Sequence, residues 1–355
     1  MNTRSVDAIA NALLYEGYML YPYRASSVKN RQRFNFGVLD PQPLSAAQTG
    51  SDASSMQTEC LVDGASLTAV EVSVRFLQLV ARSVRKLSDG AAVQQADRTP
   101  GFEPVPSLAV DGKVFAPWQE AIECGVTVPA CNLNALAARP LDWNFAFPAK
   151  EETELLRDAN GRLVGQIART RQSVEGIIQI KAVSAADGLF KVQVRVKNLT
   201  SLDDDAGRTS RDTALMRSLV STHIVLGALD GRFVSLLEPP ENLKDLAASC
   251  QNVGAWPVLV GAEGERDTVL SSPIILYDYP QIAPESPGDL FDGTEIDEIL
   301  ALRILTMTDD EKSEMRNTDE RTRKMLERTE ALPREHLIRL HGTLRELRSL
   351  KQEMP

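Results

Sequence analysis

Tyrosine and basic residues are concentrated near the start of the chain, in a pattern that fits binding to another molecule. Four of the six tyrosines fall within residues 15–23. Tyr and Arg supply much of the binding energy of protein interfaces, because they bury a large amphipathic surface and donate hydrogen bonds. The other two tyrosines flank an aspartate. The candidate partner-binding residues are therefore Tyr21, Tyr23, Arg24, Lys29, Arg31, Arg33, Tyr277, Asp278 and Tyr279.

A purely structural role fits these residues equally well. The tyrosines would then pack the N-terminal segment onto the rest of the protein, and the basic side chains would pair with the acidic run over residues 278–298. Nucleic-acid interfaces also combine aromatic and basic residues. The formal net charge of −10 argues against that partner and against a membrane surface, since both require an excess of Lys and Arg. If the segment is an interface, we expect an acidic protein partner.

Residues that would catalyse a reaction or hold a metal are sparse. The three histidines and four cysteines form no zinc motif, and neither a nucleophile elbow nor a phosphate-binding loop occurs. His223 lies in a strand-like stretch, where we expect a hydrogen-bonded structural role rather than that of a catalytic base. We predict no cofactor and no bound metal. The cysteines are expected to be free thiols: Cys60, Cys124, Cys131 and Cys250.

Short strands joined by tight turns dominate the middle of the chain. Apolar and polar residues alternate over residues 70–76, which predicts a half-buried strand. Further strands are predicted over PVLVG and SSPIILYDY. The pattern predicts a mainly β, α+β protein with an antiparallel β-sandwich-like core. Asp-Gly and Asn-Gly, which signal hairpin turns, occur at 111–112, 160–161, 187–188 and 230–231.

Helices are predicted at both ends. Apolar residues recur at helical spacing from Val6 to Leu14, with Ser5 as the N-cap. Thr308 and Glu311 predict a capping box for a helix that ends near Ala331. A leucine seam beyond it predicts a further helix. The chain therefore divides into 1–58 (an N-terminal helix, the Tyr/Arg segment and a linker), 59–293 (a β-rich core) and 294–355 (a helical C-terminal arm).

No stretch of the sequence predicts export or a membrane span. Asp7 and Glu16 interrupt the first apolar residues, unlike a secretory signal. The longest apolar runs are far shorter than the roughly 20 residues that a membrane-spanning helix needs. Four cysteines are too few for a disulfide scaffold in a chain of 355 residues. We expect a cytoplasmic protein that does not enter the membrane.

Several stretches resemble one bacterial family. They are ALLYEGYMLYPYRASSVKNRQRFNFGVL near the start, then LEPP, WPVLVG and SSPIILYDYPQIAPESPGDLFDGTEIDEILALRIL. In these stretches the chain is similar to conserved accessory proteins encoded beside nickel–iron uptake hydrogenases. The resemblance implies a cytoplasmic role in making or holding together a hydrogenase, with hydrogenase subunits or maturation factors as partners. It transfers no catalytic residue.

The leading hypothesis is a non-enzymatic accessory or assembly protein that acts on a hydrogenase through protein–protein binding. The dispersed cysteines argue against a nickel or iron carrier, because soft-metal delivery normally uses clustered ligands. One alternative is an enzyme of unknown class with its site in the β core, near His223 or the acidic run. The other is a structural module that self-associates through its C-terminal helices.

Overall fold

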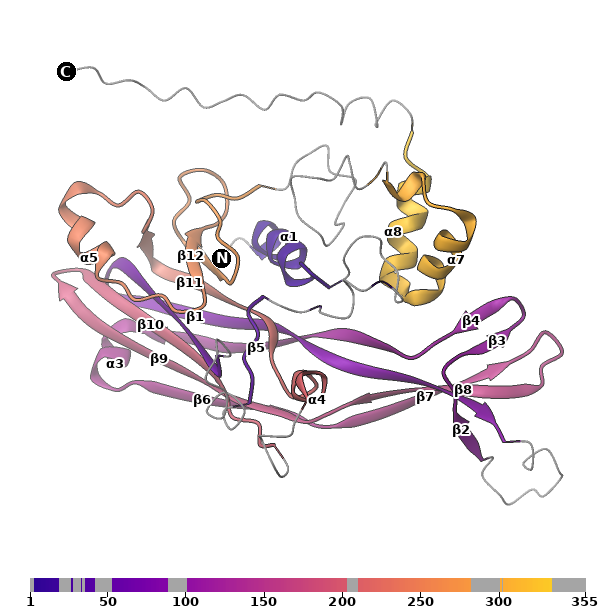
Figure 1. Ribbon diagram of the computed structural model, residues 1–355. Coiled ribbons are helices and arrows are strands. Elements are labelled where there is room, and N and C mark those ends of the chain that lie inside the picture. The colour runs from indigo at the N-terminus through magenta and orange to yellow at the C-terminus, as the bar shows by residue number, and fades with distance from the viewer. Residues whose placement is uncertain are drawn as a thin grey trace.

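The fold is built around one very long strand. The computed structural model describes residues 3–18, 27, 33, 36–41, 53–88, 101–202, 210–281, 301 and 303–333 (Figure 1). Strand β1 runs over 33 residues, Ser55–Leu87, and every strand that pairs with it is antiparallel. The other strands are β2 (Phe102–Pro104), β3 (Leu108–Val110), β4 (Lys113–Phe115), β5 (Trp118–Asn132), β6 (Leu141–Phe147), β7 (Lys150–Arg157), β8 (Leu163–Arg171), β9 (Val174–Ala186), β10 (Leu189–Asn198), β11 (Val220–Val234), β12 (Trp256–Leu259) and β13 (Thr268–Ser272).

Strand β1 changes partners along its length. One of its edges pairs first with β10, then with β5 and finally with β2. The opposite edge pairs with β11 and then with β8. Strands β9 and β6 continue the sheet beyond β10, and β13 and β12 continue it beyond β11. The described strands thus form an 11-stranded antiparallel sheet and a separate β3–β4 hairpin, which confirms the predicted mainly β, antiparallel fold class.

The main hydrophobic core lies between two layers of this sheet, because the sheet turns back on itself. In β1, the inward-facing Val70, Val72, Val74 and Phe76 are at most 1% exposed, as the alternation predicts. They share one apolar cluster with residues of β9 and β10. The Phe76 ring lies 5.5 Å from that of Phe147 in β6, although β6 pairs with β9 and not with β1. The core is therefore sandwich-like.

Three of the four predicted tight turns are confirmed. Each closes a hairpin, and each has its glycine at positive φ: Gly112, Gly161 and Gly188.

The turn predicted at residues 230–231 is wrong, because β11 continues through it to Val234. Asp230 has φ of +53° and lies opposite residues 65–68 of β1, so the bulge is in β1. The Thr68 hydroxyl donates to the Asp230 carbonyl over 2.6 Å and so links β1 to β11 at this irregularity. A second difference concerns SSPIILYDY, where only the two serines belong to a strand, since β13 ends at Ser272.

Helices from the two ends of the chain cover the outer face of the sheet. Helix α1 (Thr3–Leu14) begins before the predicted cap Ser5, and its predicted apolar residues are buried. The capping box of Thr308 and Glu311 is confirmed, but the predicted single helix is two, α7 (Asp309–Thr318) and α8 (Glu320–Glu330). The remaining helices are α3 (Leu133–Ala138), α4 (Arg211–Leu215), η2 (Glu241–Leu243) and α5 (Lys244–Ala248).

The C-terminal helices pack on the core. Met315, Met325 and Leu326 are buried in a cluster with Leu77 and Leu79, which face outward from β1. Figure 1 shows α7 and α8 above β5 and the β3–β4 hairpin, on the same side of the sheet as α1. The predicted leucine seam at 337–347 lies outside the described residues. Within the described residues, no helix combines the length and apolar character needed to cross a membrane.

Candidate functional site

Of the basic residues predicted to bind a partner, the structure describes Arg33 alone, and this residue is buried. Its guanidinium lies 3.8 Å from the centre of the Trp118 ring and is 4% exposed. It donates to the carbonyl oxygens of Tyr18 and Gln119, over 2.9 and 2.8 Å. Burial lowers the pKa of Arg33 to about 10. Arg33 thus fastens the N-terminal segment to β5, which fits a structural role for this residue rather than the partner-binding role. Outside the described residues lie Tyr21, Tyr23, Arg24, Lys29 and Arg31.

Tyr15 and Tyr18 pack the N-terminal segment onto the rest of the protein, as the structural alternative predicts. Both are buried, at 3% and 2% exposure, and their rings meet edge to face at 5.6 Å. They belong to the apolar cluster that α7 and α8 form with β1. Burial raises the pKa of Tyr18 well above its usual value of 10. The hydroxyl therefore stays protonated and can donate a hydrogen bond.

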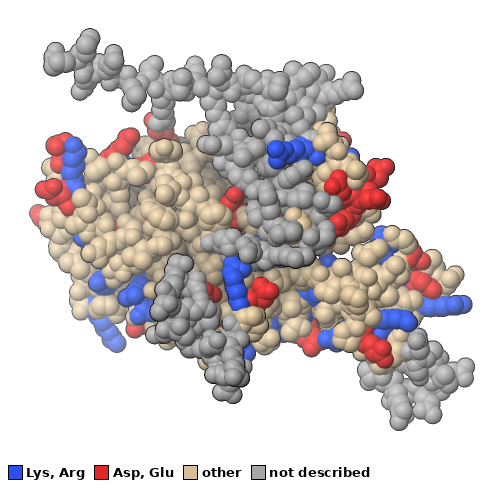
Figure 2. All heavy atoms as spheres, viewed as in Figure 1, with Lys and Arg blue, Asp and Glu red and all other residues tan. Residues whose placement is uncertain are grey.

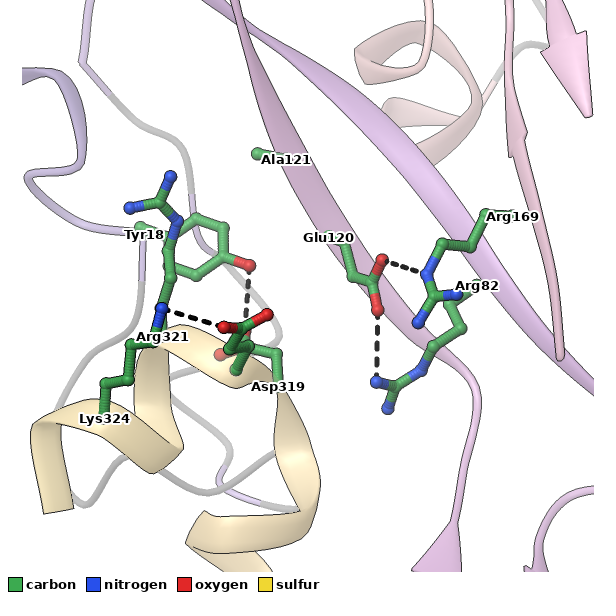
Figure 3. Close-up of a pocket in the computed structure, with 9 residues that line it drawn as sticks. Tyr18, Arg82, Glu120, Ala121, Arg169, Asp319, Arg321 and Lys324 are labelled. Atoms are coloured by element: carbon green, nitrogen blue, oxygen red, sulfur yellow. Dashed lines mark hydrogen bonds and ion pairs between the residues drawn. The ribbon is translucent and has the colours of Figure 1, made fainter. Parts of the chain in front are cut away.

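Asp319 joins three distant parts of the chain. One carboxylate oxygen accepts a hydrogen bond from the Tyr18 hydroxyl at 2.8 Å (Figure 3) and another from the Trp118 indole at 3.3 Å. The other accepts from the backbone N–H and the hydroxyl of Thr322, both at 2.8 Å, and so caps α8. The cap explains why the predicted single helix is broken here.

A cleft of about 500 Å³ opens beside Asp319, between α8 and the sheet. Figure 3 shows Arg321 and Lys324 on the wall formed by α8, and Arg82, Glu120 and Arg169 on the wall formed by the strands. Glu120 accepts from Arg82 Nη1 at 3.1 Å and from Arg169 Nε at 2.8 Å. Burial lowers the pKa of Arg169, but its hydrogen bonds to Glu154 and Glu120 outweigh this effect, and the pKa is raised.

Two of the three carboxylates that line the cleft, those of Glu120 and Asp319, are already engaged. Each oxygen of Glu120 and of Asp319 accepts at least one hydrogen bond from the protein. A general base needs an oxygen that can accept the substrate proton. Glu120 and Asp319 are therefore poorly suited to act as a general base. Sequence analysis missed Asp319 because Trp118 and Tyr18 lie about 200 and 300 residues away from it.

Residues 274–279 expose two large side chains that lie two positions apart in the sequence. Ile275 is 72% exposed and Tyr277 is 87% exposed, while Ile274 and Leu276 point inward against an apolar cluster. The surface over neighbouring β12 carries few charged side chains on the face shown in Figure 2, and elsewhere on that face basic and acidic side chains are intermixed. The exposure of Tyr277 fits its predicted role as an interface residue.

Asp278 and Tyr279 hold this segment in place. The Asp278 carboxylate accepts from the Ser235 hydroxyl at 2.5 Å and from the Leu259 N–H at 2.8 Å. The Tyr279 N–H donates to the Leu259 carbonyl at 2.7 Å, and the Tyr279 ring packs against the main core. These two residues are anchors that fix the position of Tyr277, whereas the sequence predicts that they contact the partner themselves.

His223 is a structural residue, as expected. It is completely buried in β11, and its Nδ1 donates to the Ser221 carbonyl at 2.7 Å. Its Nε2 lies 3.3 Å from the Ser272 hydroxyl. Because the ring is 0% exposed, no substrate can contact it in this structure. Within the described residues, no three Cys, His, Asp or Glu side chains form a group that could hold a metal ion.

The four cysteines are free thiols, and two of them should be unreactive. Burial raises the pKa of Cys60 to about 12 and that of Cys124 to about 11. Because the thiolate is the reactive form, we expect only Cys131 and Cys250 to react with Ellman's reagent at pH 8. All four should react in urea. Rapid reaction of all four thiols in the native protein would contradict this burial.

A scan against models of known protein families gives no match for this chain, and no curated protein is similar to it at a significant level. The function must therefore be argued from the residues themselves.

Proposed function

We propose that this chain is a non-catalytic accessory protein that binds a protein partner through the surface formed by Ile275 and Tyr277. The observation that carries the proposal is their exposure, 72% and 87%, on a segment that is fixed to the core on both sides of Tyr277. A tyrosine on a fixed backbone loses little conformational entropy on binding and offers a large amphipathic surface. Contiguous exposed apolar surface is typical of interaction sites.

The partner that we propose is a subunit or a maturation factor of a nickel–iron hydrogenase. The resemblance of the chain to hydrogenase accessory proteins supports this choice, and YDYP lies within one of the resembling stretches. The proposal includes a cytoplasmic location, as the resemblance implies. An enzyme would need a base or nucleophile that a substrate can reach, and neither the buried His223 nor the engaged carboxylates of Glu120 and Asp319 supply one.

Replacing Tyr277 with alanine should weaken partner binding without destabilising the free protein. Loss of an interface hot spot costs about 2 kcal/mol or more, which corresponds to roughly a 30-fold rise in Kd. The side chain is 87% exposed, so the melting temperature should change little. The measurement is capture of separately expressed hydrogenase subunits and maturation factors by the tagged protein, followed by titration of whichever is retained.

A matched control removes a similar side chain elsewhere. Leu155 in β7 is 50% exposed and lies at the far end of the sheet from β12 (Figure 1). Leu155→Ala should leave the affinity unchanged. The proposed surface would be refuted if Tyr277→Ala bound as tightly as the wild-type protein. The proposed partner would be refuted if the wild-type protein captured none of the hydrogenase components.

A further inference from the structure

Strand β6 differs from the other outer strands because it lacks features that prevent its edge from pairing with another chain. An exposed strand edge can pair with another chain, and proteins usually prevent this with charges, prolines or very short edge strands. Strand β7 carries four charged residues in its first five, β12 has four residues including Pro257, β5 contains Pro129, and β2 has only three residues. Strand β6, LDWNFAF, spans seven residues with Asp142 as its single charge.

The hydrogen bonds of neighbouring β9 show which backbone groups of β6 face outward. The N–H and C=O of Glu175 bond to Thr200 and Leu199, on the side of β9 away from β6. Because successive residues of a strand bond to opposite sides, Gly176 and Ile178 bond toward β6.

Their register partners in β6 are Phe145 and Trp143. The alternate residues of β6 therefore direct their N–H and C=O groups to the outer edge. They are Asp142, Asn144 and Ala146. Among the described residues, no backbone group bonds to that edge.

We propose that β6 pairs antiparallel with β6 of a second copy of this chain, around a twofold axis at Asn144. This register makes Asp142, Asn144 and Ala146 the hydrogen-bonded positions, which are the residues whose backbone groups face the free edge. Asp142 then lies opposite Ala146 of the other copy, so no like charges meet.

The side chains support the same register. It sets Trp143 opposite Phe145 and Leu141 opposite Phe147, at non-hydrogen-bonded positions, where cross-strand side chains approach most closely. Phe145 and Phe147 already contact the core residue Phe76. Trp143 stands at the rim of this cluster and is 37% exposed. Pairing of the two strands would cover Trp143 and join the two aromatic clusters.

The oligomeric state of the full chain tests the proposal. Light scattering should give a mass twice that of the 38.9 kDa chain. Asn144→Lys should halve it, because two lysines would meet directly across the axis. Asn144 is exposed, so the variant should fold normally. Thr153→Lys places the same charge at an exposed position of edge strand β7 and should remain dimeric.

Hydrogen exchange provides a measurement that needs no variant. Exchange of the Asp142, Asn144 and Ala146 amides should slow as the protein concentration rises. A monomeric wild-type protein, an Asn144→Lys variant that stays dimeric, a Thr153→Lys variant that becomes monomeric, or exchange at these amides that does not depend on concentration would each overturn the proposal.

Discussion

Replacing Asp319 with alanine is expected to lower the free energy of unfolding by about 3 kcal/mol. The substitution removes the N-cap of α8, which is typically worth about 1 kcal/mol. It also removes the acceptor of the Tyr18 hydroxyl and of the Trp118 indole, and each buried donor that loses its acceptor costs about 1–3 kcal/mol. Urea unfolding at neutral pH, followed by circular dichroism, measures the change.

Two comparisons separate this cause from a general loss of negative charge. Asp309→Ala removes an exposed acidic residue from the first turn of α7 and should change the stability by less than about 0.5 kcal/mol. A double-mutant cycle with Tyr18→Phe should give a clear coupling energy, because the Tyr18 hydroxyl and Asp319 act together. Additive effects of the two substitutions would show that the hydrogen bond contributes nothing.

Acidification from pH 6.5 to pH 4 should destabilise the protein by about 3 kcal/mol through His223 alone. Burial lowers the pKa of His223 to about 4, against about 6.5 in an unfolded chain. Between these values the unfolded state binds a proton that the folded state does not. The free energy of unfolding therefore falls by about 1.4 kcal/mol for each pH unit of acidification. Above pH 6.5 this contribution is constant.

Urea unfolding at a series of pH values measures this effect. His223→Gln should be less stable at pH 7, because it disturbs the buried hydrogen bonds, but its stability should depend less on pH over this window. The other two histidines of the chain, His336 and His341, provide the control. Replacing both with glutamine should leave the wild-type pH dependence intact. Identical pH dependence in the wild-type protein and His223→Gln would show that His223 does not titrate in this way.

Local patterns predicted those parts of the fold that depend on neighbouring residues. The alternation over residues 70–76 and the capping box at Thr308 are decided within a few positions of the chain. The same Asp-Gly signal succeeded at 111–112 and failed at 230–231, because β11 pairs with the distant strand β1 on both sides of Asp230. The break at Asp319 has a local signal, a capping aspartate three residues before Thr322, which the continuous helical pattern concealed.

The candidate site was harder to predict, because its residues come together only in the folded chain. The role of Arg33 depends on Trp118, and nothing near Arg33 in the sequence indicates that it stacks on that ring. Tyr277 was singled out by residue type, but its exposure depends on the anchoring of Asp278 by Ser235 and Leu259. The dimer edge likewise emerges only when β6 is compared with the other strands of the folded sheet.

The length of β1 has a consequence for folding during synthesis. Its partner β11 begins about 130 residues after β1 ends. At the usual rate of about 5–20 residues per second, the ribosome needs on the order of 10 s to make the intervening chain. During that time β1 has finished emerging but cannot form its full set of backbone pairs. Sheets with such distant pairings also fold slowly. The nascent chain therefore carries an unpaired edge along β1 until β11 is made.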